Sequence, residues 1–236
     1  MDVPVPHWPR RGPRGRHLQA AIEFADLGWP VCPGAYPLDE GPRACSCDRV
    51  GCPAPGAHPL SPAWAVQATT DKERLRRWWA VDPNASVVLS TGRVVDALDV
   101  PAEAGIVALA RADRSETPIG PVAAYGGDRY LFFVAIRGAP GEEEEEWWPC
   151  HLDVTDPHTQ PEPVTPELRW HSRGSYVLAP PSALVGQQVC WVRRPRDPAL
   201  PDSLPLLEVL TDTVEELARS HPAPDPRGRA MRHSGM

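Results

Sequence analysis

Four side chains in one short loop are the residues of this sequence best suited to metal chemistry. Cys45 and Cys47 are separated by one residue, Cys52 follows after four residues, and His58 after five more. Thiolates and imidazole are the donors that tetrahedral zinc prefers, and four protein ligands leave no open position for a catalytic water. The spacing therefore predicts a structural zinc site, with Cys32 as a less favourable substitute ligand. The alternative is a set of unpaired cysteines in a reducing compartment.

The elements on either side must hold this loop, because residues 34–62 are rich in proline and glycine and bury little. Before the loop, apolar residues at helical spacing predict a helix that ends at Gly28, followed by a short strand over 29–33. After the loop, Thr70-Asp71-Lys72-Glu73 has the pattern of a capping box and predicts a helix that stops before Pro83.

The rest of the chain alternates apolar runs with helical patterns. Residues 86–90 and 94–100 predict neighbouring strands joined by Thr91-Gly92-Arg93. Further strands are predicted over 121–125, 130–136, 175–179 and 189–192, and further helices over 101–112 and 204–219. In the last helix, Asp212 or Thr213 is expected to cap the second half.

Strands in hairpin-like pairs mixed with helices predict an α+β fold rather than a doubly wound sheet. We expect strands 94–100, 130–136 and 175–179 to share one mixed or antiparallel sheet. The helices over 71–79 and 102–112 are expected to cover one face of that sheet.

Composition divides the chain into four parts. We predict a disordered N-terminus over 1–15, a main domain over 16–200 that contains the zinc loop, a C-terminal helix over 201–220 and a disordered tail over 221–236. The formal net charge of −7 argues against a general electrostatic grip on nucleic acid. Because the chain has no long apolar run and no secretory signal, we expect a cytoplasmic protein without a membrane partner.

Several segments, taken in order, resemble the bifunctional DNA primase/polymerase (prim-pol) N-terminal domain family. The resemblance begins with AAIEFADLGWPVCP over 20–33 and continues with CSCDRVGCPAPGAHPL over 45–60, in the metal-binding form common among actinobacterial members. It ends with the segment GSYVLAPPS over 174–182, and the matches are collinear over residues 18–192. The resemblance implies an archaeo-eukaryotic primase-like sheet covered by helices, with the zinc loop as an insert.

Active members of this family join nucleotides with two divalent ions, Mg²⁺ or Mn²⁺, that three carboxylates hold. The resemblance places Asp99 at the first acidic position, but Pro101 at the second and Arg169 at the third. Asp96 lies three residues before Asp99, so a regular strand points it to the opposite face and makes it a weak replacement. An alternative role for Asp99 is to cap the helix that begins near Pro101.

The family also carries a Gly-Gly-x-His pattern whose histidine contacts nucleotide phosphate. Here Arg129 stands at the histidine position, after Gly126-Gly127-Asp128. We expect an anion site for phosphate, formed by Arg129, Arg169, His171 and Arg173. The two glycines alone are equally explained by an ordinary hairpin turn.

Three functions compete. The first is a catalytically degenerate prim-pol domain, a pseudoenzyme that binds nucleotide or single-stranded nucleic acid in DNA replication, with a separate helicase or replication protein as partner. The second is an active DNA primase/polymerase, a nucleotidyltransferase that holds Mg²⁺ or Mn²⁺ with Asp96, Asp99 and Glu103 in a rearranged site. The third is a structural or regulatory interaction protein. The loss of two of three acids favours the first and third.

Overall fold

The computed structural model describes residues 15–39, 41, 44–47, 49–136, 162–163, 167–196 and 198–220. Its elements, in chain order, are α1 (Arg16–Asp26), β1 (Val31–Gly34), α2 (Trp64–Gln67), α3 (Lys72–Val81), β2 (Ser86–Ser90), β3 (Val95–Pro101), α4 (Ala102–Ser115), β4 (Val122–Tyr125), β5 (Arg129–Ala135), β6 (Glu162–Pro163), β7 (Arg169–His171), β8 (Tyr176–Ala179), β9 (Ala183–Leu184), β10 (Gln187–Arg193) and α5 (Ser203–Ser220).

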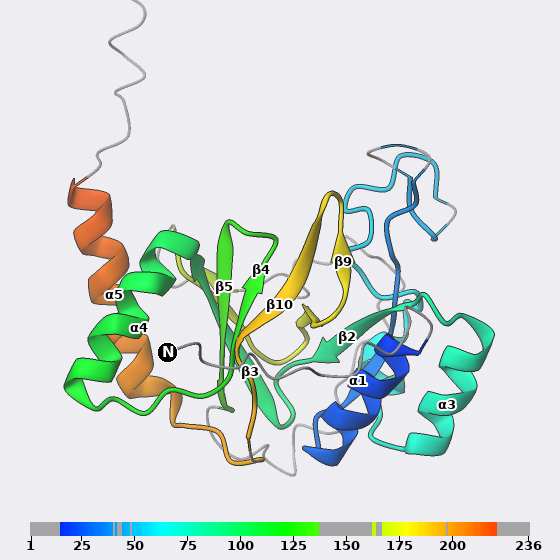
Figure 1. Cartoon of the computed structure of the whole chain (residues 1–236), viewed down its shortest axis with the longest axis horizontal. Coiled ribbons are helices and arrows are strands. Elements are labelled where there is room, and N and C mark those ends of the chain that lie inside the picture. Colours follow the sequence, from blue (N-terminus) through cyan, green and yellow to red (C-terminus); the bar gives the residue numbers. More distant parts are fainter. Residues whose placement is uncertain are drawn as a thin grey trace, which may run out of the picture.

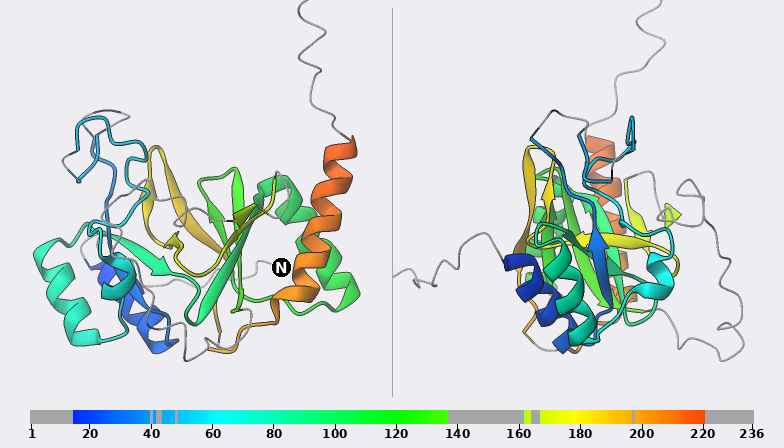
Figure 2. Two further views of the ribbon diagram at one scale, coloured as in Figure 1. Left: turned by 180° about the vertical axis from the view of Figure 1, so that it is seen from behind. Right: turned by 90° about the vertical axis from the view of Figure 1, so that its right-hand side faces the viewer.

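Two antiparallel sheets form the centre of the molecule. The larger sheet has the strand order β6-β7-β3-β5-β4-β10-β9, and the smaller sheet has the order β1-β2-β8. Helices α4 and α5 lie side by side at one end of the molecule and cover the larger sheet, while α1 and α3 lie at the other end beside the smaller sheet (Figures 1 and 2). This is the α+β architecture that the sequence predicts, with helices covering antiparallel sheets.

Strand β3, in the middle of the larger sheet, is buried on both faces. Leu98 and Val100 belong to the apolar cluster formed with α4 and α5, whereas Val95 and Ala97 belong to the cluster that includes the smaller sheet. Successive residues of a strand point to opposite faces. Asp99 therefore faces the smaller-sheet side, away from α4 and α5.

The smaller sheet corrects one part of the predicted architecture. Strands β3 and β5 share one sheet as expected and pair with each other, but β8, over the predicted 175–179 strand, pairs with β2 in the other sheet. Likewise β2 and β3 are consecutive in the chain but belong to different sheets. Of the two predicted covering helices, the one over 102–112 packs on the larger sheet, whereas α3 packs mainly against α1 and β1.

The turn at Gly92 carries the chain from one sheet to the other. Its φ of 82° lies in the left-handed region that favours glycine, and a Cβ there would lie 2.0 Å from the Cα of Arg173. The preceding Thr91 donates from its hydroxyl to the carbonyl of Ser172 at 2.7 Å. The turn after β2 is thus packed against the turn after β7, and this contact explains why the two consecutive strands part.

Three smaller predictions also differ from the structure, two in the helices and one in the strands. The N-cap of α3 is Asp71 rather than Thr70, since the Asp71 carboxylate accepts from the backbone N–H groups of Glu73 and Arg74. Helix α5 continues without a break through Asp212 and Thr213, whose hydroxyl donates to a backbone carbonyl one turn earlier. Strands β6, β7 and β9 are additional to the sequence prediction.

The two predicted disordered ends, 1–15 and 221–236, lie outside the described residues apart from Gly15. The helices that the structure describes include none that is long and apolar enough to cross a bilayer.

Replacing Asp71 with Ala should lower the free energy of unfolding by about 1 kcal/mol, because two N–H groups of the first turn of α3 lose their acceptor. Urea unfolding followed by circular dichroism measures the change. Thr70→Ala is the matched control and should change stability by less than about 0.5 kcal/mol. A larger loss for Thr70→Ala than for Asp71→Ala would restore the capping box predicted from the sequence.

Candidate functional site

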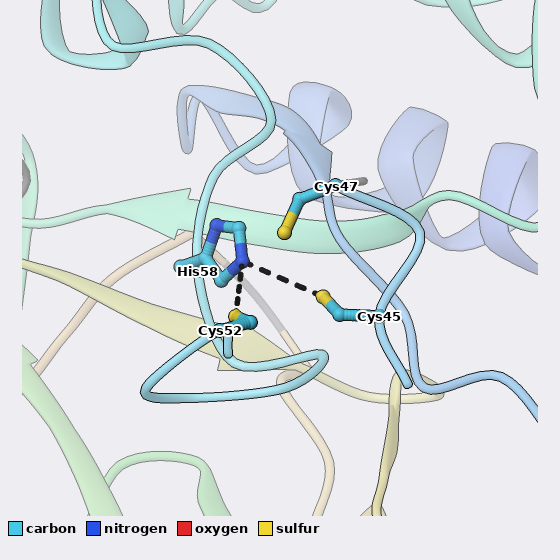
Figure 3. A group of neighbouring side chains, drawn as sticks. All are labelled: Cys45, Cys47, Cys52 and His58. Carbon is cyan, nitrogen blue, oxygen red and sulfur yellow. Dashed lines mark hydrogen bonds between the residues drawn. The ribbon is translucent and has the colours of Figure 1, made fainter. Parts of the chain in front are cut away.

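The predicted metal ligands come together in the loop between β1 and α2. One donor atom from each of Cys45, Cys47, Cys52 and His58 lies within 4.8 Å of all the others. The Nε2 atom of His58 is 3.6 Å from the sulfur of Cys45 and 3.4 Å from that of Cys52, and the sulfur of Cys47 points toward the same ring (Figure 3). The four donors thus surround one small space.

Backbone contacts hold this loop against the smaller sheet. The backbone N–H of Ala35 donates to the carbonyl of His58 at 2.8 Å, and Pro37 forms an isolated β-bridge with Cys45. Gly56 has a φ of 74°, and a Cβ there would lie 2.6 Å from the ring of Pro37. The loop therefore closes tightly enough to bring ligands from both of its ends into contact.

Contacts of His58 and Cys45 favour a bound cation, whereas burial raises the pKa of the Cys52 thiol to about 11. The Nδ1 atom of His58 lies 2.8 Å from the carbonyl of Pro59, so Nδ1–H donates there and leaves the Nε2 lone pair facing the sulfurs. Burial raises the pKa of Cys45, but hydrogen bonds from the backbone of Cys47 and Gly56 outweigh it and hold that pKa at about 7. Cys45, Cys47, Cys52 and His58 could therefore bind a metal ion.

The remaining described cysteines lie elsewhere. Cys32 is buried in β1, where loss of hydration raises the pKa of its thiol to about 12 and keeps it protonated. Cys190 is exposed on β10. The structure thus groups the four residues that the spacing predicts, without Cys32.

A second cluster surrounds Asp99, the acid that the resemblance places at the first metal-binding position. Its Oδ1 atom accepts from Nε of Arg129 at 2.5 Å. Its Oδ2 atom lies 3.5 Å from Nε2 of His171 and 4.0 Å from a guanidinium nitrogen of Arg169. Both carboxylate oxygens of Asp99 therefore face nitrogen groups that carry or can carry positive charge.

The antiparallel register explains why these four residues meet. Asp99 stands opposite Arg169 of β7, and Ala97, two residues earlier on the same face, stands opposite His171. On the other side of β3, Pro101 stands opposite Arg129 of β5. Residues that pair across strands share a face of the sheet, so the smaller-sheet face of three adjacent strands gathers one carboxylate and three basic side chains.

The four side chains of this cluster differ in how far they are exposed to solvent, and therefore in how easily a ligand can reach them. The side chains of Asp99, Arg129 and His171 are 7%, 17% and 13% exposed, whereas that of Arg169 is 49% exposed. Arg129 also donates to the backbone carbonyls of Asp99 and Glu167, each at 3.0 Å, so its guanidinium is fixed. Arg169 is the member of the cluster most accessible to a ligand.

Two neighbouring side chains support the cluster. The hydroxyl of Ser175 lies 3.0 Å from Nδ1 of His171, which fixes the orientation of that ring. Tyr125 lies directly opposite Arg129 across the β4–β5 pair. Burial, together with the negative charges of Asp99 and Asp128, raises the pKa of Tyr125, so its phenol stays protonated.

Asp96 lies on the other face of β3, as its spacing from Asp99 predicts. Its carboxylate accepts from the backbone N–H of Gly92 at 3.0 Å and from the indole N–H of Trp170 at 2.9 Å. The Glu103 side chain is exposed in the first turn of α4. These positions do not bring Asp96 and Glu103 to the carboxylate of Asp99.

The structure also places the other residues that sequence reasoning singled out. Arg173 lies in the turn between β7 and β8, where its backbone packs against Gly92. Gly126 and Gly127, with φ values of 71° and 88°, form the turn of the β4–β5 hairpin. Asp99 does not cap α4, whose N-cap residue is Pro101 and has no side-chain cap.

The sequence analysis did not predict the direct contact between Arg129 and Asp99, although the position of the turn before Arg129 indicates it. The short turn after β4 fixes where Arg129 enters the neighbouring strand. Pairing of that strand with β3 then brings the guanidinium to Asp99. Ser175 and Tyr125 gave no sequence signal of their own, because a lone hydroxyl or phenol in an apolar run is common in any sheet.

The α+β fold with antiparallel sheets, and the Cys/His loop that could bind a metal ion, fit the family that the sequence resembles. The chain matches the family described as Bifunctional DNA primase/polymerase, N-terminal, over residues 21–205. It belongs to that family. A comparison with curated proteins found no match.

Replacing Arg129 with Gln should lower the free energy of unfolding by about 2–4 kcal/mol, because the buried Asp99 carboxylate loses its closest partner. The double variant Asp99→Asn with Arg129→Gln should recover most of that loss. Chemical denaturation of the single and double variants measures the coupling. The exposed Arg114, changed to Gln, is the control and should have little effect. If Asp99→Asn alone stabilises the protein, Asp99 is a repelled metal-binding acid rather than an ion-pair partner.

Proposed function

We propose that this protein is a catalytically inactive prim-pol domain that binds nucleotides or single-stranded nucleic acid through their phosphate groups. The observation that carries the proposal is the engagement of the Asp99 carboxylate by Arg129, His171 and Arg169. In this arrangement Asp99 pairs with basic side chains of the protein itself and does not serve as a ligand for an added metal ion.

Loss of catalysis follows from the charge of the cluster. A two-metal site needs several anionic oxygens to offset the charge of the ions. Asp99 supplies one carboxylate, while Pro101 supplies none and Arg169 adds a positive charge 4.0 Å from Asp99. Each positive charge about 4 Å from a bound cation costs roughly 1–4 kcal/mol per unit charge, depending on the effective dielectric.

Phosphate binding is supported by the same charges. Arg129 and Arg169 carry two positive charges against the single negative charge of Asp99, so the cluster keeps an excess of positive charge even with His171 neutral. Guanidinium groups match the geometry of phosphate oxygens. The half-exposed Arg169 offers the first contact, and Arg173 in the adjacent turn extends the predicted basic surface.

The two other functions fit the geometry less well. An active enzyme with a rearranged site would need Asp96, but Asp96 lies on the far face of β3 and is hydrogen-bonded to Gly92 and Trp170. A purely structural role accounts for the buried Arg129–Asp99 pair but not for the half-exposed Arg169 beside it. Partnership with a helicase or replication protein, and a cytoplasmic location, stay predictions.

We also propose that the metal of the Cys/His loop is zinc and that its role is structural. Zinc bonds of about 2.3 Å to sulfur and 2.0–2.1 Å to nitrogen, in tetrahedral geometry, separate sulfur from nitrogen by about 3.6 Å. The distances from His58 Nε2 to the sulfurs of Cys45 and Cys52 are 3.6 Å and 3.4 Å. Three thiolates and one imidazole fill the four positions.

Purified without chelators, the protein should carry about one zinc ion per chain, measured by elemental analysis. Cys47→Ser should lower that content sharply, whereas Cys190→Ser, on exposed β10, is the matched control and should not. Removing the metal should speed hydrogen exchange in residues 34–62 while leaving the core strands protected, because the apolar clusters are formed elsewhere. Zinc-free wild-type protein with an ordered loop would contradict the assignment.

Wild-type protein should show no template-dependent primer extension with Mg²⁺ or Mn²⁺, yet should bind a single-stranded oligodeoxynucleotide. Arg169→Gln or Arg173→Gln should weaken that binding and lower its salt slope by about one. Fluorescence anisotropy over a range of salt concentrations measures both. Arg219→Gln, at the far end of α5, is the control. Robust extension that Asp99→Ala abolishes would show instead that a working metal site exists.

A further inference from the structure

The carboxylate of Asp99 lies where a ligand anion would have to bind. Its Oδ1 atom accepts from Arg129 at 2.5 Å, and its Oδ2 atom lies 3.5 Å from His171 and 4.0 Å from Arg169. Two oxygens on one anionic group therefore contact three basic side chains, as two oxygens of a phosphate would.

The two oxygens of Asp99 are held unequally. Arg129 binds Oδ1 closely and is itself fixed by the backbone carbonyls of Asp99 and Glu167. The contacts of Oδ2 are longer, and one of them leads to Arg169, whose side chain is 49% exposed. Solvent anions can therefore compete with Asp99 at Arg169, whereas Arg129 and His171 are largely buried.

We propose that Asp99 is a built-in counter-ion of a phosphate site that works without a divalent metal. A ligand phosphate competes with the Asp99 carboxylate for Arg169, so Asp99 limits affinity rather than providing it. This inference rests on the proposed phosphate-binding function. It makes Asp99 a competitor of the ligand anion instead of a ligand of a metal cation.

The charges of Asp99 and of the ligand determine whether each change strengthens or weakens phosphate binding. A phosphate bound at Arg169 lies near the negative carboxylate of Asp99, and this repulsion weakens binding. Neutralising Asp99 removes the repulsion and frees Arg169 at the same time. Magnesium complexed to a polyphosphate lowers the negative charge of the ligand and with it the attraction to the arginines, so Mg²⁺ weakens binding here.

The experiment compares wild type, Asp99→Asn, Asp99→Ser and Arg169→Gln by isothermal titration with inorganic tripolyphosphate, with and without Mg²⁺. A single-stranded oligodeoxythymidine is titrated in parallel to separate a nucleotide-type ligand from a nucleic-acid backbone. Both Asp99 variants should bind about five- to ten-fold more tightly than wild type, and Arg169→Gln more weakly. Asp113→Asn, an exposed acid of α4, is the control and should bind as wild type does.

Because the Asp99 variants lose an ion pair, the gain in Tm at a fixed tripolyphosphate concentration is a second readout that tolerates lower stability. It should be larger for Asp99→Asn than for wild type, and an equal or smaller gain overturns the inference.

Equal or weaker binding by both Asp99 variants also overturns the inference. The proposed function survives that result if Arg169→Gln still binds more weakly than wild type. Absence of binding by every variant overturns both. If Mg²⁺ tightens binding and Asp99→Asn abolishes that effect, Asp99 is a metal ligand and the inference is wrong.

Discussion

The antiparallel register of β7, β3 and β5 is the constraint on which the site depends. These three strands must align so that Arg169 stands opposite Asp99, while Arg129 enters from the other neighbour. A shift by one residue would turn Asp99 toward α4 and α5 and leave a carboxylate among apolar side chains. The apolar alternation of β3, with Leu98 and Val100 on one face, opposes such a shift. Burial of hydrophobic residues thus fixes the positions of the charged ones.

The aromatic core between the sheets gives this arrangement a rigid support. Trp29 stacks on Phe24 and on Phe133, with ring centroids 5.9 Å and 5.6 Å apart, and so joins α1 to β5 of the larger sheet. On the metal-loop side, Trp64 meets Tyr176 of β8 edge to face at 5.1 Å. The loop and the ion-pair cluster are therefore attached to one packed core, although they do different chemistry.

Local sequence signals predicted the longer elements well, because apolar periodicity and breakers such as Gly28 and Pro83 act within a few residues. Strand partners were harder to predict, since β2 pairs with β1 and β8, which are distant in the sequence. Strand β7 was missed because its three residues, including Arg169 and His171, lack an apolar run. The grouping of the four candidate metal ligands was predictable from spacing alone. The ion pair of Asp99 needed the register of three strands, which no single segment encodes.

The strands of the smaller sheet come from distant parts of the chain, and this affects folding during synthesis of the protein. Its strand β1 begins at Val31, whereas its last strand, β8, ends at Ala179. On the ribosome, β2 therefore waits without one of its two neighbours until most of the chain has emerged. Contacts between such distant segments slow folding, because a long loop must close before any pairing is gained. A nascent chain that stalls before Tyr176 exposes the unpaired edge of β2, all of whose residues are buried in the finished fold, to other chains or to chaperones.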